Sequence, residues 1–156
     1  MSFCKTKKII FFTGMTIISH RGNLEGPTDS ENHPLYIKNV LKRGFHCEVD
    51  VWYVGNDYWL GHDEPMHSIS SRFLKNSKLW CHAKNKEALE KMSKQDNIHF
   101  FWHEQDDYTL TSKGIIWCYP GKKIIKDSIC VKPEIEINGK LEDCSGICSD
   151  FPLLFV

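Results

Sequence analysis

Residues 47–65 read CEVDVWYVGNDYWLGHDEP, and this stretch carries the pattern on which the predicted fold depends. It begins as a strand, because valines alternate with Glu48 and Asp50, and alternate residues of a strand point to the same face. His62 follows twelve residues after Asp50, with Asp63 directly behind it. The stretch therefore predicts a strand that presents two carboxylates on one face and an excursion that returns a histidine toward them.

Six other short apolar runs share this design. Each is rich in Ile, Val, Phe, Trp or Cys and ends in polar or turn-forming residues, as buried strands do. The runs are TIIS (16–19), KLWC (78–81), IHFFW (98–102), GIIWC (114–118), SICV (128–131) and GIC (146–148).

Two helical segments lie between the first runs. Residues 34–43 open with a proline and are followed by Gly44, and residues 86–95 follow Asn85, a residue type that caps helices. Strand then helix, repeated, predicts parallel strands whose polar ends gather at one rim, where barrel and open α/β enzymes hold their sites. The later connections are shorter than a dozen residues, so the second half has little room for full helices.

Composition excludes several classes of function. The chain has 156 residues, a net charge of zero and a pI near 7.1, and its lysines are scattered. A nucleic-acid-binding surface needs a basic stripe, so no nucleic-acid partner is expected. No apolar run is long enough to span a membrane, so no integral membrane segment is expected. We expect one domain over residues 15–156, preceded by an N-terminal extension or extra strand at residues 1–14.

The seven cysteines form no CxxC pair, and Cys47, Cys81, Cys118 and Cys130 lie inside apolar runs. There they are typical of small buried hydrophobes rather than of disulfides or a zinc site. A reducing compartment fits this usage best, and the predicted localisation is cytoplasmic.

The predicted rim brings together groups that suit cleavage of a phosphodiester. Carboxylates bind hard cations through oxygen, arginine and lysine bind phosphate, and two imidazoles can exchange protons with two oxygens. The residues at the strand ends are His20, Arg21, Glu48, Asp50, His62, His82 and Lys84.

Four motifs in this order resemble the glycerophosphodiester phosphodiesterase family, within the superfamily of phospholipase C-like phosphodiesterases. They are HRG at 20–22, ExD at 48–50, HD at 62–63 and the final GICSDFP at 146–152. The resemblance implies a TIM-type (β/α) barrel, and a chain well below about 250 residues implies a compact, trimmed one. We expect seven or eight mostly parallel strands with shortened outer helices.

The resemblance also implies an activity, namely metal-dependent hydrolysis of a small glycerol- or lipid-derived phosphodiester. Carried over by position, it implies acid/base roles for His20 and His62, phosphate binding by Arg21 and Lys84, and metal binding by Glu48 and Asp50. His82 stands where the family has an acid, and as a metal ligand it favours Zn or Mn over the Mg or Ca that the resemblance implies.

Other interpretations of the same residues remain open. The protein could be a non-catalytic binder of phosphorylated headgroups, or a zinc metallohydrolase of another class using His82, His103 and Glu134. His103, Glu104 and Glu134 sit at strand ends where they could line a pocket, and Asp150 is interpreted as a turn residue. A shortened barrel exposes apolar surface, so the oligomeric state is open and a dimer is one alternative.

Overall fold

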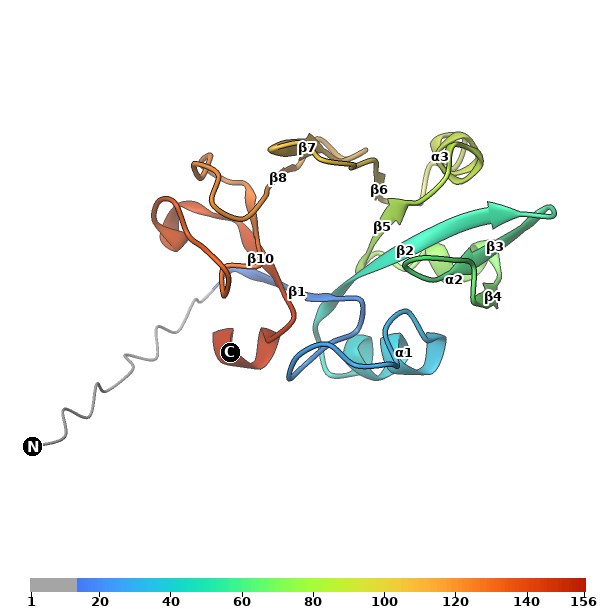
Figure 1. The fold of residues 1–156 in the computed structure, drawn as a ribbon, viewed down its shortest axis with the longest axis horizontal. Helices are drawn as coiled ribbons and strands as arrows, with labels where there is room; N and C mark the ends of the chain where they lie inside the picture. The colour runs from blue at the N-terminus through green and yellow to red at the C-terminus, as the bar shows by residue number, and fades with distance from the viewer. Residues whose placement is uncertain (1–13) are drawn as a thin grey trace, which may run out of the picture.

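A single mixed sheet of ten strands forms the framework of this computed structural model, which describes residues 14–156 (Figure 1). The predicted extension or extra strand at residues 1–14 lies outside the described residues, apart from Gly14. The strands are β1 (Thr16–His20), β2 (His46–Val54), β3 (Asp57–Leu60), β4 (His67–Ile69), β5 (Leu79–Ala83), β6 (Phe100–Phe101), β7 (Tyr108–Leu110), β8 (Ile116–Cys118), β9 (Ile129–Val131) and β10 (Gly146–Ser149).

Seven of the strands run parallel in the order β6-β5-β2-β1-β10-β9-β8. These are the seven apolar runs that the sequence indicates, so the predicted parallel α/β architecture is confirmed. The long strand β2 continues beyond its parallel neighbours into an antiparallel hairpin with β3, and β4 extends it. Gly55 and Asn56, with φ of 60° and 68°, form the two-residue turn of this hairpin.

The closed barrel predicted from the sequence is not confirmed. Within residues 14–156 no strand ladder joins β6 to β7 or β8, although Figure 1 shows β6 and β7 side by side along the curve of the sheet. The connection from β6 to β8, residues 102–115, forms no helix and contains β7, which pairs antiparallel with β8. We call the junction between residues 99–102 and residues 109–112 the seam.

One backbone hydrogen bond and several side-chain hydrogen bonds hold the seam together in place of a ladder. The Ser112 amide donates to the Phe100 carbonyl at 2.8 Å, and the Thr109 hydroxyl donates to the Trp102 carbonyl at 2.7 Å. A third contact joins the buried ring of His99 to the Thr111 hydroxyl at 2.7 Å.

Two of the three helices in residues 14–156 lie where the sequence predicts them, and the short helix at residues 71–74 was not expected. They are α1 (Pro34–Lys42), α2 (Ser71–Leu74) and α3 (Lys86–Ser93), and after α3 only the 3₁₀ turns η1 (Leu141–Asp143) and η2 (Pro152–Phe155) follow. Asn85 caps α3 by accepting from the Ala88 amide at 3.0 Å. No helix in residues 14–156 has the length and apolar character needed to cross a membrane.

The alternation of side chains divides the core into an outer part and an inner part. The outward residues of β2 and β5, with α1 and α3, form the larger cluster, which includes Cys47, Val49, Val51 and Cys81. The inward residues of the curved sheet form a second cluster that includes Ile18, Trp80, Phe101 and Trp117. All six described cysteines are buried and free. Glu48 and Asp50 therefore face inward, above the second cluster.

Acid should destabilise the fold through the seam. Burial, with Lys113 and His46 nearby, lowers the pKa of His99 from 6.5 to about 4, so the unfolded chain binds more protons than the fold between these values. Stability should therefore fall as the pH falls from about 6.5 to about 4. We expect the melting temperature, followed by circular dichroism at pH 7 and pH 5, to drop less in His99→Gln than in the wild type.

A residual drop is expected in that variant, because burial also lowers the pKa of His20. Equal drops in both proteins would show that the seam histidine does not carry the acid sensitivity.

Candidate functional site

The inward side chains meet at a cavity of about 570 Å³ at the carboxyl ends of the parallel strands. This volume is within the range of small-molecule sites. Most of the predicted site residues line it, namely His20, Arg21, Glu48, His62, His82, Lys84, His103 and Glu104. Asp50 lies fully buried beside them. Sequence reasoning missed Phe101, Tyr119 and Lys132 as lining residues.

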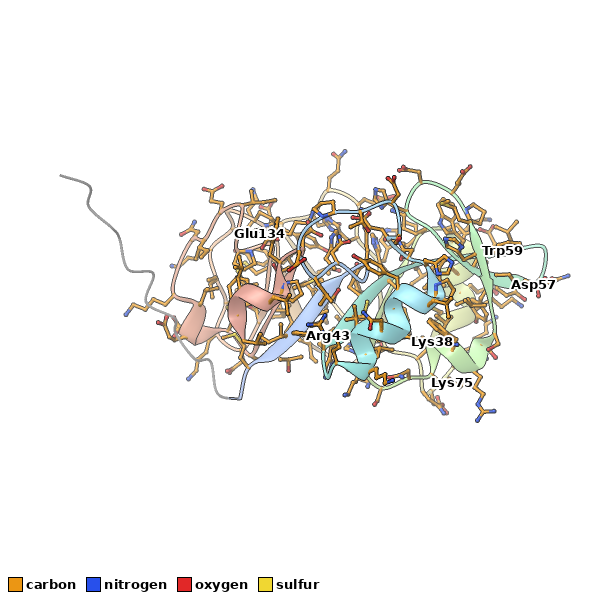
Figure 2. The ribbon with its side chains drawn as sticks, turned by 90° about the horizontal axis from the view of Figure 1, so that it is seen from below. Lys38, Arg43, Asp57, Trp59, Lys75 and Glu134 are labelled. Atoms are coloured by element: carbon orange, nitrogen blue, oxygen red, sulfur yellow. The ribbon has the colours of Figure 1, made fainter. Side chains whose placement is uncertain are left out.

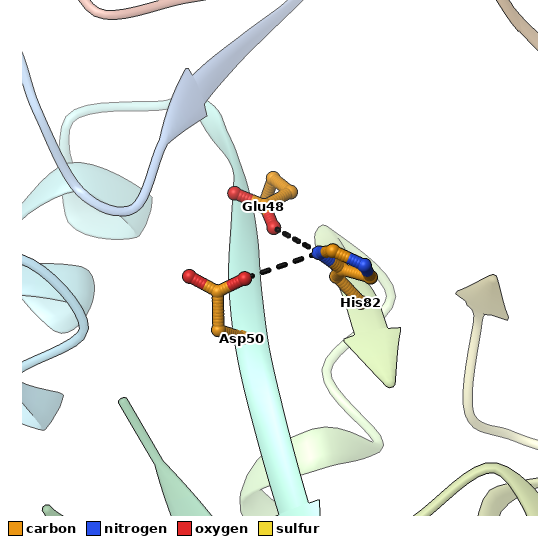
Figure 3. A group of neighbouring side chains, drawn as sticks. All are labelled: Glu48, Asp50 and His82. Atoms are coloured by element: carbon orange, nitrogen blue, oxygen red, sulfur yellow. Dashed lines mark hydrogen bonds and ion pairs between the residues drawn. The ribbon is translucent and has the colours of Figure 1, made fainter. Parts of the chain in front are cut away.

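Glu48, Asp50 and His82 form a compact group that could hold a metal ion (Figure 3). Strands β2 and β5 pair in parallel with Asp50 opposite His82, and Glu48 lies on the same face two residues earlier. The Nδ1 atom of His82 is 3.1 Å from Asp50 Oδ1 and 3.9 Å from Glu48 Oε1. One ligand atom from each residue lies within 4.8 Å of the others.

The backbone contact of His82 determines which of its nitrogens can bind a metal. Nε2 lies 3.0 Å from the carbonyl oxygen of His103, so this nitrogen carries a hydrogen and donates it. Nδ1 then faces the two carboxylates. If Nδ1 is protonated, it donates a hydrogen bond to them, and if it is not, its lone pair can bind a cation that the carboxylates also bind. A hydrogen bond on the far nitrogen is the usual way in which proteins orient a metal-binding histidine.

Burial of two carboxylates side by side makes their charge costly. Burial and the nearby charge of Asp50 raise the pKa of Glu48 well above its usual value. Burial alone would also raise the pKa of Asp50. Hydrogen bonds from His62 and His82 and the charge of Arg21 outweigh the effect of burial and lower the pKa of Asp50 well below its usual value. The buried Glu48 Oε2 has no hydrogen-bond partner in residues 14–156. An unpartnered oxygen beside a charged carboxylate suits a divalent cation.

Asn32 supports Asp50 from the loop before α1. Its amide donates to Asp50 Oδ2 at 2.9 Å, and its own oxygen accepts from the Asp50 backbone amide at 2.9 Å. Asn32 is almost fully buried and has a left-handed φ of 61°, a conformation that asparagine tolerates better than most residues. Nothing in the sequence pattern distinguishes it, so sequence reasoning missed this residue.

Asp150 does more than the turn role expected of it, because it orients His20. Its Oδ1 lies 2.7 Å from Nδ1 of His20 and also accepts from the Asn23 amide at 2.9 Å. Burial alone would raise the pKa of Asp150, but the hydrogen bond and charge of His20 lower it below its usual range. Nδ1 of His20 therefore donates, and Nε2 is left facing the cavity side, 3.7 Å from Glu48. In the sequence, the signal for this orienting role is that Asp150 belongs to the final motif, GICSDFP at residues 146–152.

Arg21 connects the first and third motifs. It has a left-handed φ of 57°, and its Nε lies 3.0 Å from Asp50 while NH1 lies 3.3 Å from Glu31. Its NH2 lies 3.4 Å from Nε2 of His62, whose side chain is 41% exposed. The excursion after β2 thus returns His62 to the carboxylates, as the sequence predicts.

The remaining predicted residues divide between the cavity and the framework. Lys84 lines the cavity just after β5, and His103 and Glu104 lie at its edge. Glu134 does not line it, and instead accepts from the Ser149 hydroxyl and the Asp150 amide, both at 2.9 Å. Figure 2 places Glu134 over the C-terminal strands, far from Trp59 in the β2–β3 hairpin.

The alternative zinc site of His82, His103 and Glu134 is not assembled. Among residues 14–156, the only three His, Cys, Asp or Glu side chains close enough to share an ion are those of Glu48, Asp50 and His82. His103 contacts His82 through its backbone carbonyl, while its ring stacks on Tyr119 with centroids 3.6 Å apart.

Gly61 allows the tight turn that delivers His62. A Cβ at this position would overlap the carbonyl oxygen of Glu64, and the Gly61 carbonyl accepts from the Trp52 ring nitrogen at 2.7 Å. We expect Gly61→Ala to lower the free energy of unfolding by about 2 kcal/mol or more, because backbone must shift. Gly55→Ala is the control, since its left-handed turn has open space and should cost only about 1 kcal/mol. Urea denaturation measures both, and equal losses would contradict the steric argument.

The metal group can be tested by direct titration. Glu48→Gln should weaken the binding of Mn²⁺ or Zn²⁺, measured by isothermal titration calorimetry, by about tenfold or more. The raised pKa of Glu48 indicates that the fold tolerates a neutral group there, so the variant should stay folded. Glu104→Gln removes an acid at the cavity edge outside the group and should leave the affinity unchanged. Equal affinity in all three proteins would exclude the site.

Comparison with known proteins gives no assignment for the chain. No protein-family model matches it, and neither a curated protein nor a solved structure does. Interpretation of the site therefore depends on its geometry and on the motif resemblance.

Proposed function

We propose that this protein is a metal-dependent phosphodiesterase that hydrolyses a small glycerol- or lipid-derived phosphodiester. We also propose that its curved sheet is a reduced form of the barrel of the glycerophosphodiester phosphodiesterase family. One observation carries the proposal: three motifs separated along the chain converge on one cavity. His20 and Arg21, the Glu48–Asp50 pair and His62 all meet there, although 41 residues separate Arg21 from His62.

Binding of the phosphate would use the cationic side of the cavity. Arg21 and Lys84 line it, and the partial pairing of Arg21 with Glu31 and Asp50 holds the guanidinium in place. Arginine recognises a phosphate with two donors, and lysine adds a point charge. A divalent cation, when bound by Glu48, Asp50 and His82, would supply neutralisation of phosphate charge and polarisation of the phosphorus centre.

His20 is suited to take a proton from the attacking oxygen. Burial lowers its pKa, so the ring is neutral near pH 7, and Asp150 keeps the hydrogen on Nδ1. Nε2 is then the basic atom on the cavity side. A base oriented by a carboxylate in this way is a common arrangement in hydrolytic enzymes.

His62 would protonate the leaving alkoxide from the other side of the phosphate. Its greater exposure, 41%, is consistent with contact with the part of the substrate that departs. The attacking oxygen would be water or a neighbouring hydroxyl of the substrate. In the second case a cyclic phosphate forms first, with the leaving alcohol carrying away the proton from His62.

Turnover of bis(p-nitrophenyl) phosphate with Mg, Ca, Mn or Zn tests the proposal. We expect metal-dependent release of nitrophenol, and a fall in kcat of about 100-fold or more in His20→Ala. Asp150→Asn should lower kcat in the same direction, because it removes the orientation of His20. His67→Ala is the control, since His67 lies on β4 and does not line the cavity.

The results also separate the alternatives. Turnover that does not depend on metal, or that survives in His20→Ala, would overturn the mechanism. Phosphodiester binding without turnover, unchanged in His20→Ala, would favour the non-catalytic binder.

A further inference from the structure

Lys132 is a cavity residue whose presence the proposed chemistry does not require. It follows β9 directly with a left-handed φ of 47°, an uncommon conformation for a residue with a side chain. Its amide donates to the Cys148 carbonyl at 2.6 Å, and its carbonyl accepts from Ile135 at 2.9 Å. Unfavourable backbone conformations persist mainly where the surroundings enforce them, and they cluster at functional sites. This turn places the lysine side chain at the cavity.

Lys132 is one of three cationic side chains that line the cavity, with Arg21 and Lys84, against two acidic ones, Glu48 and Glu104. Its Nζ lies 3.4 Å from Asp150 Oδ2, and the side chain is 28% exposed. Lys84 has no ion pair within 4.0 Å among the described residues. The two lysines follow β9 and β5, which lie on opposite sides of the curve of the sheet in Figure 1, where β9 is the strand between β8 and β10. A ligand in the cavity therefore meets positive charge from two sides.

Asp150 pairs with Lys132, and Asp50 and Glu31 pair with Arg21, whereas the two acids that line the cavity leave Lys84 unpaired among the described residues. Glu48 belongs to the metal group, and a divalent cation there would add positive charge. Glu104 is exposed at the edge. A like charge brought into a partly buried site is disfavoured, because water screens it poorly there.

Stacking engages three aromatic residues of the cavity, Phe101, Trp117 and Tyr119, with other rings. Phe101 stacks on both His82 and Trp117, at centroid distances of 5.1 and 4.7 Å. Tyr119 stacks on His103. Ring faces engaged in stacking are not free to bind a quaternary ammonium, which aromatic cages bind through several ring faces. The buried Trp117 Nε1 has no acceptor among residues 14–156, and a hydroxyl oxygen of a ligand would satisfy it.

We propose that Lys132 is a specificity-determining residue and that the substrates are glycerophosphodiesters with neutral or anionic, hydroxyl-bearing headgroups. Cationic headgroups such as choline are excluded by charge. This inference depends on the proposed phosphodiesterase function and adds the class of substrate to it.

Competition between two substrates in one reaction tests the inference. Glycerophosphoglycerol and glycerophosphocholine share the phosphodiester and differ in headgroup charge. The ratio of their kcat/KM values, measured by mass spectrometry of the released headgroups, cancels any general effect of a variant on His20 through Asp150. We expect a wild-type preference for glycerophosphoglycerol of about tenfold or more.

Charge variants at the same position give the expected order. Lys132→Met keeps the side-chain length and should reduce the preference several-fold, and Lys132→Glu should reduce it further or reverse it. Met and Glu both have to adopt the left-handed backbone conformation found at position 132. Melting temperatures verify that each variant is folded. Lys140→Glu makes the same charge change at an exposed position outside the cavity and should leave the ratio unchanged.

The outcomes distinguish this inference from the proposed function. Metal-dependent hydrolysis of bis(p-nitrophenyl) phosphate supports the proposed function whatever the headgroup result. With that activity present, an equal preference in the wild type, a ratio unchanged in Lys132→Glu, or no hydrolysis of either glycerophosphodiester overturns the inference alone. Absence of all phosphodiester hydrolysis overturns both.

Discussion

Two carboxylates buried side by side on β2 are the constraint on which the rest of the site depends. Charge removed from water needs compensation, and here it comes from three elements: Arg21 after β1, His82 on β5 and Asn32 before α1. Each of these contacts requires the parallel register that places His20 beside Glu48 and Asp50 beside His82. The charge requirement and the strand pairing therefore support the same arrangement.

The two halves of the chain stabilise their strands by different means. The first half covers the outer face of its strands with α1 and α3, and its core is apolar and continuous. The second half has only 3₁₀ turns after α3, and carboxylates tie its strand ends together. Glu134, for example, binds the end of β10 and so supports Asp150, which in turn orients His20. Framework and site thus share residues in the second half.

Local patterns predicted the seven parallel strands, the two longer helices and the convergence of His20, Glu48 and His62, because these depend on periodicity and on parallel topology. They did not predict β3 and β4 in the excursion after β2, or β7 in the connection from β6 to β8. They also did not predict the roles of Asn32, Asp150 and Lys132. Two of these residues adopt left-handed conformations that no periodicity signals, and all three act through partners more than ten residues away. Closure of the sheet was predicted by resemblance, and it depends on pairing across the seam.

The seam has a consequence for motion. Strand ladders share many backbone bonds and open cooperatively, whereas the seam depends on a few bonds, three of them through side-chain hydroxyls. Phe101 and Trp102 lie on one side of the seam. On the other side, beyond β7, Trp117 lies on β8 and Tyr119 directly follows this strand, and all four residues line the cavity. We therefore expect fluctuations of the framework to concentrate at this wall of the cavity, so that opening of the seam would widen the cavity entrance and speed the exchange of bound molecules.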